Sequence, residues 1–191
     1  MCSSEIRNLR RREYLSSGEH CPFCVKAVGG RRLRVLLLLL LSWSVASSLW
    51  IYPHSLSYFN ESIGGPENGH QHLLGSNLDW GQDLRYLKWW MEGHPDARPL
   101  GLASFGAYDP SDIGLQFQTP ALKLELGRFE PGFRPERGWH ALSINLLHGY
   151  CWTAYDGKGM KVHFGGEKLS SFREMAPLAR IGYSIVVYRV E

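Results

Sequence analysis

The side chains best suited to chemistry lie in one short block, SNLDWGQDL at residues 76–84. Asp79 and Asp83 are four positions apart, so in a helix both carboxylates would face the same side. Such a pair performs acid–base chemistry if burial separates the two pKa values, and it binds a divalent cation if further oxygen ligands join it. The structural interpretation is that the two side chains cap a helix and offset its dipole. We favour capping for this pair.

The neighbours of these carboxylates suit a sugar. Amide groups such as those of Asn77 and Gln82 hydrogen-bond to hydroxyl groups, and the indole face of Trp80 offers an apolar surface to a pyranose ring. The candidate ligand site is therefore a carbohydrate-facing patch made of Asn77, Asp79, Trp80, Gln82 and Asp83. We expect no catalytic residue, no metal ligand and no cofactor.

Two histidines precede this block. His70 and His72 align on one face only if the chain is extended there, and with Asp79 they would then ligate a metal. Exposed loop histidines are the commoner case, and we favour it here. Residues 60–62 (NES) fit an N-glycosylation sequon, which has meaning only in a eukaryotic secretory pathway.

The cysteines give only weak patterns. Cys151 with His140 and His148 suggests a Cys–His nucleophile, but no third orienting group accompanies them, so we expect buried or incidental residues. Cys21 and Cys24 have C-x-x-C spacing, which can hold zinc or cycle as a redox pair. The tail around them lacks both a full ligand set and a thioredoxin-like unit, so incidental reduced cysteines are the favoured interpretation.

Several elements should position these residues. The pattern predicts a helix from about Asp79, with an apolar stripe at Leu84, Leu87 and Met91 and an end at Gly93. Strands are expected at residues 72–76, 100–105, 139–147 and 181–190, short helices at 109–112 and 170–175, and an irregular excursion or hairpin at 116–137. This alternation predicts a small layered α/β domain with about four strands.

The charge of the chain is distributed unevenly. Residues 1–34 hold eight basic and three acidic side chains, a net charge of +5, whereas the whole chain carries +3 and the remainder therefore −2. A slightly acidic domain lacks the basic face that binds phosphate backbones, so we expect no nucleic-acid partner. The basic residues instead precede a hydrophobic segment, where the positive-inside rule would place them.

Residues 35–51 are 17 residues without a formal charge, beginning with a leucine run. As a helix they would be about 26 Å long, which nearly spans a bilayer core once flanking residues contribute. We expect a cytoplasmic tail at 1–32, a transmembrane helix at 33–52 and an extracytoplasmic α/β domain at 53–191. A cleaved signal peptide, suggested by Ser44-Val45-Ala46, and a buried soluble helix are the alternatives.

Five sequence blocks stand out together. They are YPHSLSYFNE at 52–61 with GGP at 64–66, SNLDWGQDL at 76–84, SFGAYDP at 104–110, ALSINLLHG at 141–149 and ARIGYSIVVYR at 179–189. Over residues 35–191 this set resembles the C-terminal end of bacterial polytopic glycosyltransferases of the dolichyl-phosphate-mannose protein mannosyltransferase-like family. The resemblance covers the last membrane helix of those enzymes and the extracytoplasmic domain after it.

The resemblance also implies what the chain lacks. The family's catalytic carboxylate lies in an early extracytoplasmic loop, which has no counterpart here, so no catalytic residue is carried over. The expected function is that of a membrane-anchored accessory or remnant domain of a lipid-linked-sugar glycosyltransferase, inactive alone, with a polytopic glycosyltransferase and a glycan or lipid-linked sugar as partners. The alternatives are a free-standing exported glycan- or surface-binding module and, third, an independent hydrolase using Asp79 and Asp83.

Overall fold

The computed structural model describes residues 30–126 and 131–191. Most of the expected cytoplasmic tail, including Cys21 and Cys24, lies outside the described residues. The chain divides into two compact units, the first ending at Ala46 and the second running from Ser47 to Glu191. The last turn of the N-terminal helix therefore belongs with the domain that follows it.

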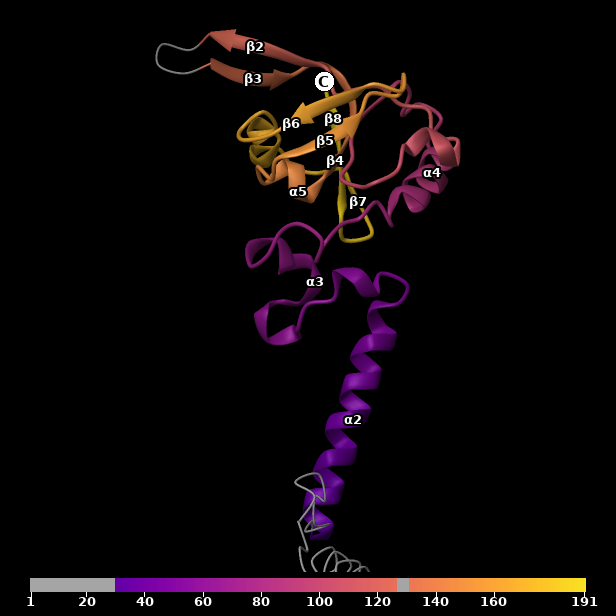
Figure 1. Ribbon diagram of the computed structural model, residues 1–191, viewed down its shortest axis with the longest axis vertical. Coiled ribbons are helices and arrows are strands. Elements are labelled where there is room, and N and C mark those ends of the chain that lie inside the picture. Colours follow the sequence, from indigo (N-terminus) through magenta and orange to yellow (C-terminus); the bar gives the residue numbers. More distant parts are fainter. Residues whose placement is uncertain (1–29, 127–130) are drawn as a thin grey trace, which may run out of the picture. The chain divides into compact units, whose positions relative to one another are not determined.

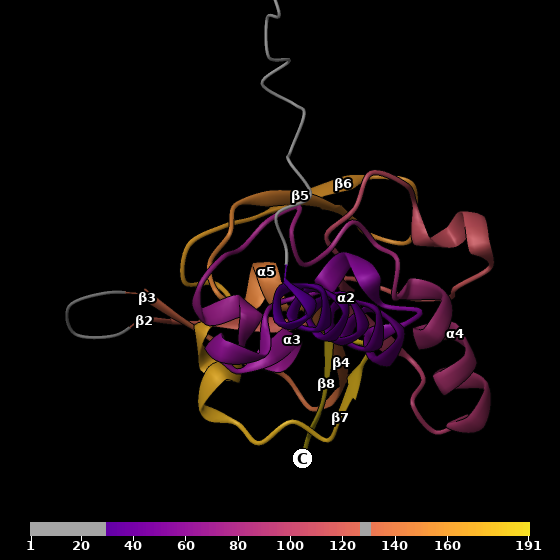
Figure 2. The same ribbon diagram turned by 90° about the horizontal axis from the view of Figure 1, so that it is seen from below.

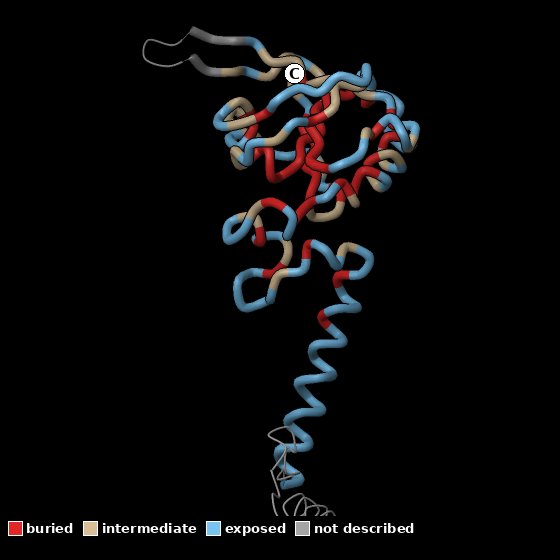
Figure 3. Tube along the Cα trace, viewed as in Figure 1, coloured by how far each residue is buried: buried red, intermediate tan, exposed pale blue. Residues whose placement is uncertain are grey.

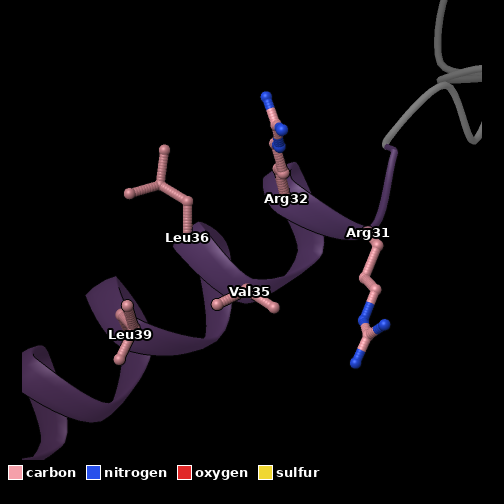
Figure 4. Close-up of a pocket in the computed structure, with 5 residues that line it drawn as sticks. All are labelled: Arg31, Arg32, Val35, Leu36 and Leu39. Carbon is pink, nitrogen blue, oxygen red and sulfur yellow. The ribbon is translucent and has the colours of Figure 1, made fainter.

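The N-terminal helix is α2 (Arg31–Ile51), and it is apolar on all sides. Its side chains are exposed except for Ser47 and Ile51, and its leucines are 44–69% exposed (Figure 3). Arg31 and Arg32 project from its first turn beside Val35, Leu36 and Leu39, which line an open depression along the helix (Figure 4). An all-round apolar surface fits a membrane span, and a signal sequence near the N-terminus meets the same criteria of length and composition. The helix ends two residues before Pro53, which lacks the N–H that a helix interior requires.

The domain contains a four-stranded mixed sheet in the order β1-β4-β8-β7. Its strands are β1 (Leu100–Ala103), β4 (Gly138–Ser143), β7 (Ala179–Ile181) and β8 (Ile185–Val190). β1 and β4 are parallel, whereas β8 is antiparallel to both β4 and β7. Residues 140–143 of β4 and 185–188 of β8 are all buried, so these parts of the two central strands are buried on both faces.

Successive side chains of the central strands enter two separate hydrophobic clusters. On β8, Ile185 and Val187 pack with Leu84, Leu87 and Met91 of helix α4 (Leu84–Gly93). The alternate residues of β8, Val186 and Tyr188, pack in the other cluster. This cluster includes residues of the helical turns at 144–147 and 170–174 and of the hairpin at 152–164. This alternation follows from the two-residue period of a strand, so the sheet is covered on both sides (Figure 2).

Two antiparallel hairpins and several short helical turns complete the domain. The first hairpin pairs β2 (Leu122–Leu126) with β3 (Pro131–Pro135) and extends away from the main sheet in both views (Figures 1 and 2). The second pairs β5 (Trp152–Tyr155) with β6 (Lys161–Phe164). The helical turns are η1 (Ser55–Ser57), η2 (Glu61–Ile63), α3 (Gly65–Asn68), η3 (Gly69–Gln71), η4 (Pro110–Ile113), α5 (Ile144–Leu147) and η5 (Ser170–Glu174).

The expected mixed α/β class with one N-terminal apolar helix is confirmed. A single layered sheet of about four strands describes the domain only roughly, because the two hairpins form sheets of their own. The strand expected at residues 72–76 is wrong, since these residues form an irregular segment after η3 with turns at its two ends. The strand expected at 139–147 ends at Ser143, where α5 begins, and the one at 181–190 is interrupted by a turn at 182–184.

Candidate functional site

Residues 76–83 form a loop with turns, and α4 begins only at Leu84. The expectation of a helix starting near Asp79 is therefore wrong. Asp83 occupies the N-cap position of α4, but its side chain makes no capping hydrogen bond. The physical reason is that both carboxylates of this loop bind groups far away in the sequence.

Asp83 is fully buried and joins three segments of the chain. Its Oδ2 atom accepts hydrogen bonds from the backbone N–H groups of Tyr183 and Ser184, each at 3.2 Å, and from the Ser184 hydroxyl at 2.8 Å. Its Oδ1 atom lies within hydrogen-bond distance of His54, 2.8 Å from Nδ1. The loop is thus tied to the β7–β8 turn and to the segment that follows α2.

His54 lies between the rings of Tyr86 and Tyr183, with centroid separations of 4.8 and 5.6 Å. A histidine held by a buried carboxylate is the arrangement that orients a general base. However, the Ser184 hydroxyl donates to Asp83 and not to His54. The order of contacts is therefore His–Asp–Ser, which does not activate the serine as a nucleophile.

Asp79 is 1% exposed and has its own set of donors. Its Oδ2 atom accepts a 2.5 Å hydrogen bond from the Ser143 hydroxyl, and its Oδ1 atom accepts one of 2.7 Å from the Gly81 N–H. Burial raises the pKa of the Asp79 carboxyl to about 7, although these hydrogen bonds act in the opposite direction, and the nearby charge of Asp83 raises it further. Near neutral pH the loop therefore holds one carboxyl group that exchanges a proton.

The backbone of the loop is also held by side chains. The Ser57 hydroxyl donates to Leu78 O at 2.8 Å, and the Tyr108 hydroxyl donates to Gly81 O at 2.5 Å. Burial raises the pKa of Tyr108, and the charge of Asp79 adds to this effect. Just before the loop, the Asn145 side chain accepts from Gly75 N–H at 2.8 Å and donates to Gly75 O at 3.0 Å.

The five residues of the expected carbohydrate patch separate into two groups. Asp79 and Asp83 are buried, and Gln82 binds the loop itself through Leu78 O and the Trp80 N–H. Asn77 and Trp80 are exposed, and the Trp80 side chain is 44% accessible. The loop therefore leaves one amide and one indole for a ligand.

Sequence reasoning missed the partners of this loop, although a signal was present. They lie in the other four sequence blocks singled out above: His54 and Ser57 in 52–61, Tyr108 in 104–110, Ser143 in 141–149 and Ser184 in 179–189. Each of these four blocks hydrogen-bonds to the block at 76–84. The five sequence blocks are thus joined in the folded chain by one connected set of hydrogen bonds.

The remaining histidines and Cys151 have contacts of their own, whereas Cys21 and Cys24 lie outside the described residues. The described residues contain no group of three or more His, Cys, Asp or Glu side chains able to hold a metal ion. His70 and His148 contact each other with ring centroids 4.6 Å apart and planes tilted by 32°, and burial lowers the pKa of both. His72 contacts Ile63 O and His140 contacts Glu136 O, whereas Cys151 is exposed.

A pocket of about 240 Å³ lies elsewhere, between α4 and the chain after η4. It is lined by Lys88, Met91, Glu92, Arg98, Gly114, Leu115 and Gln116. None of the five expected ligand residues lines it or the depression on α2. The loop at 76–83 is thus built for internal contacts, with Asn77 and Trp80 as its outward groups.

Comparison with known proteins adds no family to this description, because no protein-family model, no curated protein and no solved structure matches the chain.

Proposed function

We propose that this chain is a membrane-anchored accessory domain of a lipid-linked-sugar glycosyltransferase, without the catalytic membrane core. The observation that carries this proposal is the cluster of contacts around the loop at 76–83. Asp79 and Asp83 bind Ser143, Ser184 and His54 and line neither pocket described above. Carboxylates used in this way hold a domain together, and they fit a positioning role better than a catalytic one.

The proposed arrangement follows the charge distribution of the chain. α2 crosses the cell membrane once, the basic tail lies in the cytoplasm, and the domain lies outside. There it positions an acceptor or stabilises a polytopic glycosyltransferase that supplies the catalytic carboxylate and the cavity for a polyprenyl-phosphate sugar. The domain itself performs no transfer.

Co-purification tests this proposal. The full chain is expressed with a C-terminal tag in its native host, membranes are extracted in mild detergent, and bound proteins are identified by mass spectrometry. We expect a polytopic glycosyltransferase that lacks a C-terminal domain of its own, and restored transfer activity when the two are combined. The Asp83→Ala variant should lose the partner, whereas Asp96→Ala, at an exposed position, should keep it. Recovery of the intact chain from the membrane without a bound glycosyltransferase would refute the proposed partnership.

A second candidate is a free-standing glycan-binding module, and the exposure of Trp80 and Asn77 favours it. An exposed indole stacks on the apolar face of a sugar ring, and an adjacent amide binds its hydroxyl groups. Binding of the purified chain to a glycan array, lost in Trp80→Ala and retained in Trp89→Ala, would identify this function. Trp89 is a suitable control because its side chain is also exposed, at 55%.

A further inference from the structure

The segment between α2 and the loop at 76–83 folds back onto the end of the helix. This juxtamembrane segment, residues 52–73, contains η1, η2, α3 and η3 (Figure 1). The Ser47 hydroxyl donates a 2.7 Å hydrogen bond to the carboxylate of Glu61 in η2. Ser47 lies four residues before the last residue of α2, which is about 6 Å along the helix axis. Glu61 and its neighbours therefore lie level with the last turn of the apolar helix.

The same segment exposes several large apolar side chains. Leu56, Tyr58, Ile63 and Leu73 are 42%, 42%, 40% and 49% exposed, although small residues such as Ser57, Gly65 and Gly69 are buried. At the end of α2, Trp50 and Tyr52 are 89% and 75% exposed. Aromatic residues at this position are typical of membrane interfaces. Exposed apolar and aromatic side chains thus occur both at the end of α2 and in the segment that follows it.

The charged residues of the segment limit how deeply it could enter a lipid bilayer. No lysine or arginine occurs between Arg34 and Arg85, so attraction to anionic lipids does not hold the segment at the surface. The hydrogen bond from Ser47 lowers the pKa of Glu61, which therefore stays charged and belongs among headgroups rather than in hydrocarbon.

We propose that residues 52–73 lie in the interfacial layer of the bilayer and bind a lipid surface through Leu56, Tyr58, Ile63 and Leu73. This inference rests on the membrane anchoring of the proposed function. The segment inserts its apolar side chains between headgroups, independently of lipid charge. The domain is thereby held at the membrane surface by two contacts, the spanning helix and the juxtamembrane segment.

Depth-dependent quenching tests the inference. The four cysteines of the full chain are replaced by serine, and single cysteines are introduced at Leu49, Leu56, Ile63 or Met160 and labelled with an environment-sensitive fluorophore. Each protein is reconstituted into phosphatidylcholine vesicles with spin labels at shallow or deep acyl positions. Leu49 lies in α2 and Met160 is 67% exposed near the β5–β6 turn, so they are the positive and negative controls.

The expected result is quenching of the Leu56 and Ile63 probes by the shallow label, about twofold stronger than by the deep label. Replacing part of the lipid with phosphatidylglycerol should leave this ratio unchanged. Unquenched probes at both Leu56 and Ile63, with the Leu49 probe quenched, would overturn the interfacial segment and leave the anchor intact. A Leu49 probe that is also unquenched would overturn the anchor itself.

Discussion

Asp83 makes four hydrogen-bonding contacts with groups far away in the sequence, one with His54, one with Tyr183 and two with Ser184. Replacing it with alanine would leave the buried N–H of Ser184, the N–H of Tyr183 and the ring of His54 without their acceptor. Buried donors that lose a charged acceptor are costly, so we expect Asp83→Ala to lower the free energy of unfolding by about 2 to 5 kcal/mol. Denaturant titration of the full chain in detergent, followed by tryptophan fluorescence, measures this change.

Asp96→Ala is the matched control, because Asp96 is exposed and is itself an aspartate in the same domain. A surface substitution of this kind should change the free energy of unfolding by no more than about 0.5 kcal/mol. Equal losses in the two variants would contradict the role given to Asp83.

The buried carboxyl of Asp79 should make the stability of the domain depend on pH. The pKa of Asp79 is raised to about 7 in the folded chain, compared with 3.8 for the free side chain. The folded state therefore binds more protons between these values, and the contribution of Asp79 to stability is present in full below pH 4 and is lost as the pH rises through 7. A shift of this size corresponds to about 3 to 5 kcal/mol.

Asp79→Asn isolates this effect. An asparagine can accept from the Gly81 N–H and donate to the Ser143 hydroxyl, so it keeps both contacts without a charge to bury. The stability difference, variant minus parent, should rise between pH 4 and pH 8 in favour of the variant. Asp112→Asn, at an exposed position, should give a difference that does not change with pH. A difference for Asp79→Asn that does not change between pH 4 and pH 8 would show that folding does not raise the pKa of Asp79.

At the scale of elements, the turn between β7 and β8 depends on a glycine. Gly182 has φ = 57°, and a Cβ atom placed there would clash with the carboxylate of Asp83. Gly182→Ala therefore has two costs. An alanine in the left-handed conformation costs about 1 to 2 kcal/mol, and the displacement of Asp83 adds to this. We expect it to destabilise the domain by at least about 2 kcal/mol more than a glycine substitution that causes no clash, since a buried charge loses its partners.

Gly166→Ala provides that comparison. Gly166 has nearly the same φ, 59°, and no atom lies within 4 Å of its Cβ position. The difference between the two variants in thermal or denaturant unfolding then measures the clash alone. Similar losses for both would mean that the turn moves away from Asp83 without cost.

The elements that the sequence predicts well are those whose cause is local. The leucine run gives α2, the Ile, Val and Tyr residues give β8, and Pro110 with its neighbours gives η4. The start of α4 could not be predicted in this way. Asp79 binds Ser143, 64 residues away, and Asp83 binds Ser184, 101 residues away. Hydrogen bonds to these partners hold both aspartates in a loop, although their four-residue spacing predicts the first turn of a helix.

The strand expected at 139–147 was overestimated for a similar reason. Its apolar and polar residues alternate as in a strand, yet α5 begins at Ile144 and places the Asn145 side chain on Gly75. Asp79, Gln82 and Asp83 lie in one loop, as their spacing suggests, but the carbohydrate patch stays a prediction. The contacts of these three residues were not predictable, since they depend on burial and on partners from three distant blocks.

At the scale of the whole molecule, the proposed topology predicts that the parts before and after α2 lie on opposite sides of the membrane. Cys151 is exposed and is the only cysteine in the described part of the chain, whereas Cys2, Cys21 and Cys24 precede α2. With the N-terminus in the cytoplasm, a membrane-impermeant maleimide added to spheroplasts should label Cys151 and no other cysteine. Labelling should disappear in Cys151→Ser.

Detergent then distinguishes the three interpretations of α2. An anchored chain gains label at Cys2, Cys21 and Cys24 once the membrane is dissolved, because these cysteines were shielded behind it. A chain cleaved as a signal peptide is shorter and gains none, since the tail has been removed. A soluble cytoplasmic chain shows no label at Cys151 until the cells are broken, and the four cysteines then become accessible together. We expect the first pattern, because α2 exposes leucines on all sides and carries its arginines at the N-terminal end.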